Sequence, residues 1–169
     1  MFNYLYPDLY VSSVFEIPYA KLLSSNINTL LFDVDNTLLP HFVPRFEDGF
    51  ISFLAEISAM GFKICILSNG SKKRVELLME NLPYKYVYRA CKPLLFGINK
   101  AFSVLDTASG NCAVIGDQIF TDILVGKRKK VYTILVEPVS KKDEFIVKIK
   151  RGVENLIINE YKKSRSNIN

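Results

Sequence analysis

The sequence alternates short apolar runs with longer amphipathic segments, and this alternation constrains the fold more than any other feature of the chain. Short apolar runs bounded by polar residues are typical of buried strands in a parallel sheet, and the amphipathic segments between them are typical of surface helices. The runs that predict strands are 29–34, 62–67, 86–88, 112–115 and 132–136. Strands alternating with helices predict an α/β fold, in which helices cover both faces of a mostly parallel sheet.

The segments between these runs predict the helices. The segment 47–60 carries apolar residues at helical spacing, and Gly61 follows it as a stop signal. In the last predicted helix, Phe145, Ile149, Val153 and Leu156 are expected to form one apolar face. This last helix is expected over 143–161, and the remaining helices are expected at 17–23, 71–81, 93–105 and 122–126.

The chain length of 169 residues suits a single domain. We expect that domain to span residues 1–169, with an N-terminal extension over about residues 1–27 and a basic tail over about residues 162–169. No apolar run approaches the roughly 20 residues that a membrane-spanning helix needs. Three cysteines without zinc-like spacing are expected to be reduced, as in a cytoplasmic protein.

Polar side chains capable of chemistry stand directly after the predicted strands. Ligands of a doubly wound fold bind at the carboxyl ends of its strands, so these residues are expected to collect at one edge of the sheet. They are Asp33, Asp35, Ser68, Asn69, Lys92, Asp117 and Asp122.

The acidic members of this set favour phosphate chemistry with Mg²⁺. The cation prefers a few carboxylates and keeps phosphate oxygens as further ligands, and Asp33 together with Asp117 or Asp122 would supply those carboxylates. A carboxylate screened by the metal can attack a phosphate, while Asp35 in a different environment protonates the leaving group and then activates water. The alternative for 33–38 is an Asx-rich turn that closes a strand, and the alternative for Asp117 is a helix N-cap.

The other members offer positive charge and hydrogen-bond donors. Lys92 would stabilise the phosphoryl oxygens, and Ser68 with the backbone N–H groups around Asn69 and Gly70 would bind them. An ordinary surface lysine and a polar turn at the end of a strand are the alternatives for these two features.

These residues resemble the four motifs of the haloacid dehalogenase (HAD) superfamily, in order and in spacing. The matching segments are Asp33-x-Asp35-Asn36-Thr37, Ser68, Lys92-Pro93 and Gly116-Asp117-x4-Asp122. The resemblance implies a Rossmann-like core with strand order 5-4-1-2-3. It also implies Asp33 as nucleophile, Asp35 as acid/base, Ser68 and Lys92 as phosphate binders, and a Mg²⁺ ion bound by Asp33, Asp117, Asp122 and the backbone carbonyl of Asp35.

The stretches between the motifs are short. The stretch from Asp35 to Ser68 holds one loop and one helix, and neither it nor the stretch from Ser68 to Lys92 has room for a sizeable cap domain. This arrangement resembles the capless subclass IIIA, with an open active site.

Longer matching segments, among them Gly116–Asp122 and Tyr132–Pro138, resemble the YqeG-type family, which is similar to mitochondrial phosphatidylglycerophosphate phosphatases. The resemblance implies a lipid phosphomonoester as substrate. The basic run 127–130 and the aromatic N-terminus would then suit peripheral contact with an anionic membrane. Nucleotides and sugar phosphates remain alternative substrates, and the oligomeric state is left open.

Two classes other than enzymes also remain open. A phospho-receiver module combines similar residues around Mg²⁺, but its phosphorylated aspartate follows the third strand, whereas Asp33 follows the first of the predicted strands. A nucleic-acid-binding or scaffold protein finds support only in the basic run 127–130, and no RNA-binding aromatic motif accompanies it, so nucleic acid is not an expected partner.

Overall fold

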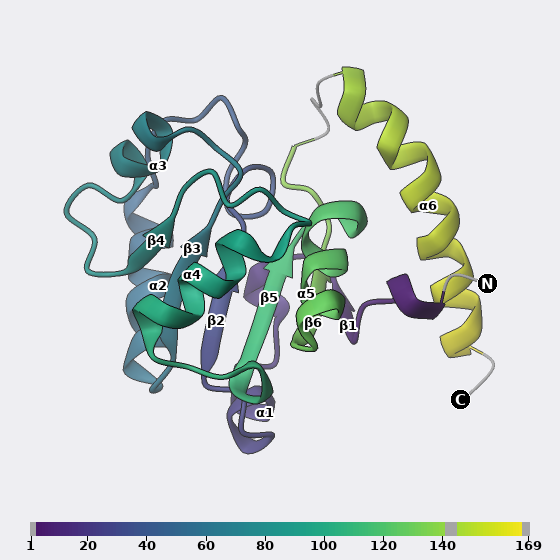
Figure 1. Ribbon diagram of the computed structural model, residues 1–169, viewed down its shortest axis with the longest axis horizontal. Coiled ribbons are helices and arrows are strands. Elements are labelled where there is room, and N and C mark those ends of the chain that lie inside the picture. Colours follow the sequence, from purple (N-terminus) through teal and green to yellow (C-terminus); the bar gives the residue numbers. More distant parts are fainter. Residues whose placement is uncertain (1–2, 141–144, 167–169) are drawn as a thin grey trace.

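The computed structural model describes residues 3–140 and 145–166, and a six-stranded parallel sheet forms its centre (Figure 1). The strand order is β1-β6-β5-β2-β3-β4, with β2 at the middle of the sheet. Five of these strands have the predicted order, which confirms the α/β doubly wound core. The strands are β1 (Leu9–Val11), β2 (Thr29–Phe32), β3 (Lys63–Leu67), β4 (Lys85–Val87), β5 (Cys112–Gly116) and β6 (Tyr132–Val136).

The helices cover both faces of the sheet because alternate residues of each buried strand point to opposite faces. Leu30 and Phe32 of β2 pack in the cluster that contains residues of α1, α2 and α3, whereas Leu31 packs with residues of α4 and α5. These helices are α1 (Tyr19–Ser24), α2 (Asp48–Ala59), α3 (Lys72–Leu78), α4 (Leu95–Leu105) and α5 (Leu124–Lys129). Between residues 35 and 92, the described chain contains no inserted domain that could cap the carboxyl edge of the sheet.

The N-terminal segment is part of the sheet, where the sequence predicted only an extension. Leu9 pairs with Ile134, so β1 lies parallel to β6 at the edge of the sheet. The Asp8 carboxylate accepts hydrogen bonds from the Thr133 backbone N–H at 2.8 Å, the Thr133 hydroxyl at 2.7 Å and the Lys127 ammonium at 2.6 Å. These contacts hold a strand that is too short to be stable by itself.

The last helix, α6 (Phe145–Ser166), packs beside the N-terminal segment (Figure 1). Its contact face differs from the predicted one: Val153 and Leu156 are 46% and 63% exposed, whereas Glu154, Ile157 and Tyr161 are buried. The face that contains Ile157 is the one that packs against the domain, because it contacts an apolar cluster formed by the end of β6 and the turn after β5. The side chains of the other two predicted residues, Phe145 and Ile149, lie outside the described part.

Within residues 3–140 and 145–166, no helix combines the length and the apolar character that crossing a bilayer would need.

Candidate active site

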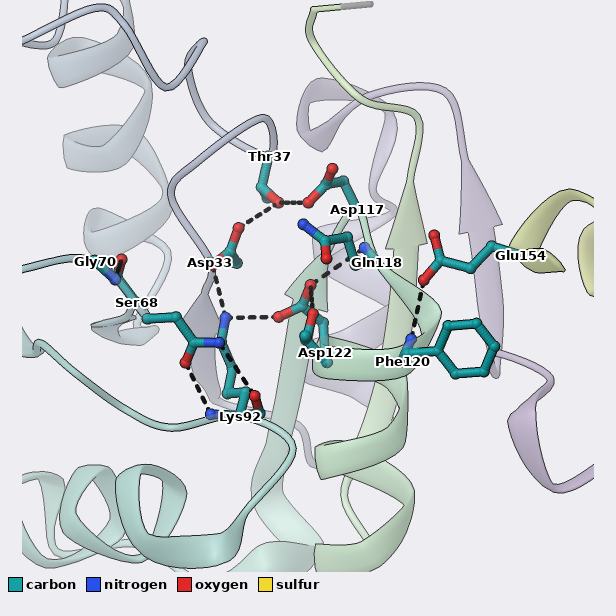
Figure 2. Close-up of polar contacts among 12 residues, drawn as sticks. Asp33, Thr37, Ser68, Gly70, Lys92, Asp117, Gln118, Phe120, Asp122 and Glu154 are labelled. Atoms are coloured by element: carbon teal, nitrogen blue, oxygen red, sulfur yellow. Dashed lines mark hydrogen bonds and ion pairs between the residues drawn. The ribbon is translucent and has the colours of Figure 1, made fainter. Parts of the chain in front are cut away.

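The nucleophile candidate, Asp33, directly follows β2 at the centre of the carboxyl edge. The chain then turns sharply: the backbone N–H groups of Thr37 and Leu38 both donate to the carbonyl of Val34, at 3.2 and 2.9 Å. Asn36 adopts φ 65°, a left-handed conformation that asparagine tolerates better than most residues. The turn places Asp33 and Thr37 in one cluster (Figure 2).

Lys92 joins two of the predicted acids (Figure 2). Its ammonium lies 2.6 Å from Oδ1 of Asp33 and 2.6 Å from Oδ1 of Asp122, and its side chain is almost fully buried. Burial by itself lowers the pKa of Lys92, but the Asp122 and Asp33 carboxylates raise it more, so the ammonium stays charged. The lysine therefore forms a fixed positive charge between two carboxylates from different strand ends.

Asn69 holds the backbone at this lysine. Its side-chain amide donates to the carbonyl of Lys92 at 3.1 Å, and its side-chain oxygen accepts from the backbone N–H of Lys92 at 2.8 Å. The side chain is thus engaged in positioning the backbone of Lys92.

Thr37 connects the nucleophile to the acid that follows β5. Its hydroxyl lies 3.0 Å from Oδ2 of Asp33 and 3.1 Å from Oδ1 of Asp117, and it donates its one proton to either carboxylate. The sequence identified Thr37 as part of a motif without giving it a role. In the structure it fixes the separation of two carboxylates.

The three buried aspartates fit a divalent cation. One carboxylate oxygen from each of Asp33, Asp117 and Asp122 lies within 4.8 Å of the others. Lys92 balances one of the three negative charges, and a Mg²⁺ ion would balance the other two, which burial otherwise makes unfavourable. Burial also raises the pKa of the Asp122 carboxyl, an effect that the Lys92 ammonium offsets only in part.

Asp122 takes a supporting position in this group. Besides Lys92, it accepts from the Gln118 backbone N–H at 3.2 Å and from the Thr121 hydroxyl at 3.1 Å. Its carboxylate lies directly against Gly116, where a Cβ atom would come within 2.2 Å of the Asp122 carboxyl carbon. A glycine at the end of β5 is therefore required for this acid to reach the site.

The turn after β3 holds the residues predicted to bind a phosphate, and one of the predicted donors, the backbone N–H of Gly70, is engaged within the turn itself. Ser68 is 1% exposed, and its hydroxyl oxygen accepts from the backbone N–H of Gly70 at 2.9 Å. A Cβ on Gly70 would lie 3.0 Å from that hydroxyl and 3.6 Å from the Asp35 carboxylate, so the turn and the acid/base candidate are neighbours.

Asp35 has a partner that the sequence reasoning missed. Arg74, in the first turn of α3, places Nε 2.8 Å and Nη2 2.6 Å from Oδ1 of Asp35. Its Nη1 donates to the carbonyl of Val43 at 3.1 Å, in the loop that follows the nucleophile turn. The only signal in the sequence is that α3 begins at the carboxyl edge, so a long side chain in its first turn reaches the site.

A large apolar hollow lies beside the cluster of Asp33, Thr37 and Asp117. Its volume is about 790 Å³, and Thr37 is part of its wall. The N-terminal segment around Phe15, the loop after β2, the start of α2 and the segment around Val139 form the rest of the wall. No sequence pattern predicts this hollow, because its walls come from four separate parts of the chain.

Comparisons with known proteins agree with this geometry. A family model described as HAD-hydrolase-like matches residues 83–145. The chain is 36% identical over 161 residues to the probable phosphatase YqeG of Bacillus subtilis (strain 168), which covers 95% of this chain and 94% of that protein.

Two solved structures share the fold. An uncharacterized protein from Listeria monocytogenes serotype 4b superposes with a TM-score of 0.54 at 15% identity, over 69% of this chain and 85% of that one. The hypothetical protein XCC2798 from Xanthomonas campestris gives a TM-score of 0.51 at 12% identity, over 73% of this chain and 71% of that one. At these identities the likeness extends to the fold alone.

Proposed function

The chain belongs to the YqeG-type family of HAD-superfamily phosphatases, as its motifs predicted, and from this premise we propose that it hydrolyses phosphate monoesters with Mg²⁺ through a phosphorylated Asp33. The observation that carries the proposal is the cluster of three buried carboxylates within 4.8 Å, two of them bridged by Lys92 at 2.6 Å. A receiver module would have no use for Asp35, which promotes hydrolysis.

In the first step, a carboxylate oxygen of Asp33 attacks the phosphorus atom. The bond from phosphorus to the leaving oxygen breaks, and Asp35 in its protonated form gives that oxygen its proton. Lys92 and the Ser68 turn stabilise the charge on the transferring phosphoryl group. A Mg²⁺ ion held by Asp33, Asp117 and Asp122, with the Asp35 carbonyl, would supply the charge neutralisation that lets one anion approach another.

In the second step, Asp35 removes a proton from a water molecule, and the water oxygen attacks the phosphorus atom of the aspartyl-phosphate. The bond between phosphorus and the Asp33 oxygen breaks, which releases inorganic phosphate and restores the Asp33 carboxylate. Asp35 is again protonated, so the cycle balances.

The test is phosphate release from a panel of phosphatidylglycerophosphate, nucleotides, sugar phosphates and p-nitrophenyl phosphate, with Mg²⁺ and with EDTA. We expect turnover only with Mg²⁺, and a loss in kcat of at least about 10³-fold in Asp33→Asn. Asp106→Asn is the matched control: Asp106 is exposed and left-handed at φ 48°, where asparagine fits equally well. Turnover by Asp33→Asn at the wild-type rate would exclude the nucleophile role.

For the substrate, we propose a lipid phosphomonoester such as phosphatidylglycerophosphate, bound from an anionic membrane surface. The apolar hollow next to Thr37 can hold part of a lipid chain. Large apolar side chains more than half exposed follow the carboxyl ends of β2, β4 and β6 around the open site, and they suit a membrane interface: Phe42, Leu94, Phe96 and Val139.

The basic run predicted for membrane contact lies less favourably. Lys130 lies two residues before the start of β6, so it is near the amino ends of the strands, away from the site. Lys127 is paired with Asp8, and Arg128 donates to the carbonyl of Pro93 at 3.0 Å. The exposed apolar side chains at the carboxyl edge are therefore the better candidates for membrane contact.

Gly49 offers a direct test of the lipid proposal. It lies in the wall of the hollow, in the first turn of α2, and a Cβ there meets no atom within 4 Å. Gly49→Leu adds a branched side chain to the wall of the hollow without a clash at its Cβ, so we expect KM for phosphatidylglycerophosphate in mixed micelles to rise about tenfold, while kinetics with p-nitrophenyl phosphate stay unchanged.

Gly49→Ala is the matched control, because alanine raises the helix propensity at this position as leucine does, but leaves the hollow open. An unchanged KM for the lipid in Gly49→Leu would exclude the hollow as the lipid site. Faster wild-type turnover of nucleotides or sugar phosphates than of the lipid would exclude the lipid as substrate and leave the phosphatase proposal intact.

A further inference from the structure

A buried glutamate from the C-terminal helix contacts the loop that carries two of the candidate metal ligands. Glu154 of α6 is 2% exposed, and its Oε1 accepts a hydrogen bond from the backbone N–H of Phe120 at 3.0 Å (Figure 2). Phe120 lies between Asp117 and Asp122 in the sequence. The contact therefore links α6, which lies outside the four motifs, to the segment that would bind the metal.

The contacted segment is the first turn of a helix. Residues Ile119–Ile123, labelled η4, form a π-helical turn that continues directly into α5. The first N–H groups of a helix have no partner within the helix, and an anion at that end is favourable. Glu154 satisfies one of these N–H groups, and does so from another part of the chain.

Within this turn, the backbone N–H groups of Asp122 and Ile123 both donate to the carbonyl of Gln118, at 3.0 and 3.3 Å. The turn therefore closes on itself at one end, and Glu154 holds it at Phe120 from outside. Since Asp117 precedes the turn and Asp122 lies within it, the position of the turn sets the distance between the two acids.

Apolar contacts bring Glu154 to this place. Ile157, one turn further along α6, packs in a buried cluster with Ile119, Ile123 and Leu135. Packing alone would be served by an apolar residue at position 154, whereas a buried carboxylate is unfavourable unless its hydrogen bonds compensate. The hydrogen bond to Phe120 is an interaction that an apolar residue at this position could not make.

We propose that Glu154 is a positioning residue, through which α6 holds the 117–122 segment in the geometry that binds the metal ion. Partners that orient metal ligands typically contribute about 10- to 100-fold to metal affinity. The metal part of this inference rests on the proposed function, whereas the contact with Phe120 does not.

The test uses the full chain with Glu154→Met and Glu154→Gln. Methionine keeps the volume and removes the acceptor, whereas glutamine keeps an oxygen that can accept from Phe120. Asn159→Ala, at an exposed position of the same helix, is the control. The two readouts are hydrogen exchange of the Phe120 amide in metal-free protein, measured by NMR, and the Kd for Mg²⁺, measured by titration calorimetry.

We expect Glu154→Met to speed exchange at Phe120 by about tenfold or more and to raise the Kd for Mg²⁺ by at least about tenfold. Glu154→Gln should stay within about threefold of wild type in both readouts, because the same hydrogen bond can form. Asn159→Ala should change neither.

A lower melting temperature in Glu154→Met with an unchanged Kd for Mg²⁺ would show a merely structural role and overturn the proposal. If Glu154→Met does not fold, Glu154→Gln decides: loss of Phe120 protection or of Mg²⁺ affinity in that variant overturns it as well. If wild type binds no Mg²⁺, the proposed metal site fails, while the exchange rates still report whether Glu154 holds Phe120.

Discussion

The catalytic candidates differ in how far the sequence could identify them. Asp33 and Asp117 directly follow β2 and β5, and Lys92 and Asp122 lie a few residues after β4 and β5. Parallel strands bring their carboxyl ends together, so the meeting of these residues could be predicted. Arg74 and Glu154 lie on helices, where a contact depends on side-chain length and on how the helix packs. Neither property has a periodic signal in the sequence.

Arg74 gives a prediction at this scale. Because its guanidinium contacts both Asp35 and the carbonyl of Val43, removing it should free the acid/base candidate and the loop above it. We expect Arg74→Met to lower kcat about tenfold, with Arg74→Lys intermediate because lysine cannot make the paired contacts. Steady-state kinetics on p-nitrophenyl phosphate measure this.

Lys73→Met is the control for Arg74→Met, since Lys73 is its exposed neighbour in α3. Equal kcat in Arg74→Met and Lys73→Met would show that Asp35 needs no fixed position for its role.

At the scale of elements, the strands of the core were more predictable than those at its margin. The run 29–34 is long and apolar and predicts β2 directly, whereas β1 has three residues and partly exposed side chains. Pairing with β6 and the contacts of Asp8 make β1 a strand, and both are long-range. The contact face of α6 was predicted wrongly for a related reason. The helix has two adjoining apolar faces, and only the tertiary structure decides which of them packs against the domain.

The Asp8 contacts give a pH prediction. Partial burial alone raises the pKa of Asp8, but the hydrogen bonds from Lys127 and Thr133 lower it below its ordinary value. A lowered folded-state pKa gives stability that is present above the unfolded-state pKa and is lost as the pH falls through the folded-state pKa. We expect Asp8→Asn to lose about 1 kcal/mol at pH 7, since the 34% exposure of the Asp8 side chain limits the effect.

Urea unfolding at pH 7 and at pH 2.5 measures this loss. The difference between Asp8→Asn and wild type should shrink at the lower pH, because protonated Asp8 no longer pairs with Lys127. A difference that stays the same at both values would contradict the ionic origin of the contact.

At the scale of the whole molecule, charge balance links the active site to stability. Two of the three buried carboxylates contact one buried ammonium, so these four side chains together carry more negative than positive charge at the centre of the fold. The sequence predicts which charged residues form the site. It does not predict that they are buried, and burial is what makes their net charge unfavourable. The apolar hollow was equally outside the reach of the sequence, because four distant segments form it.

The consequence should appear in thermal unfolding. Lys92→Met removes the shared positive charge, and breaking a buried pair costs about 3–5 kcal/mol. We therefore expect a large drop in Tm for metal-free Lys92→Met, and a larger rise in Tm on adding Mg²⁺ than wild type shows. Lys85→Met, at an exposed position of β4, is the control.

Equal Mg²⁺-induced shifts in Lys92→Met and wild type would mean that the cation does not share the site with the lysine.

The parallel sheet also has a consequence for the newly made chain. Asp33 is separated from Lys92 by 59 positions, and Lys92 from Asp122 by a further 30. The central strand β2 leaves the ribosome early, whereas its neighbour β5 and the loop 117–122, which carries Asp117 and Asp122, emerge much later. We expect a nascent chain arrested between Lys92 and β5 to lack the second partner of this lysine, and to gain phosphatase activity only once the residues after β5 have been added.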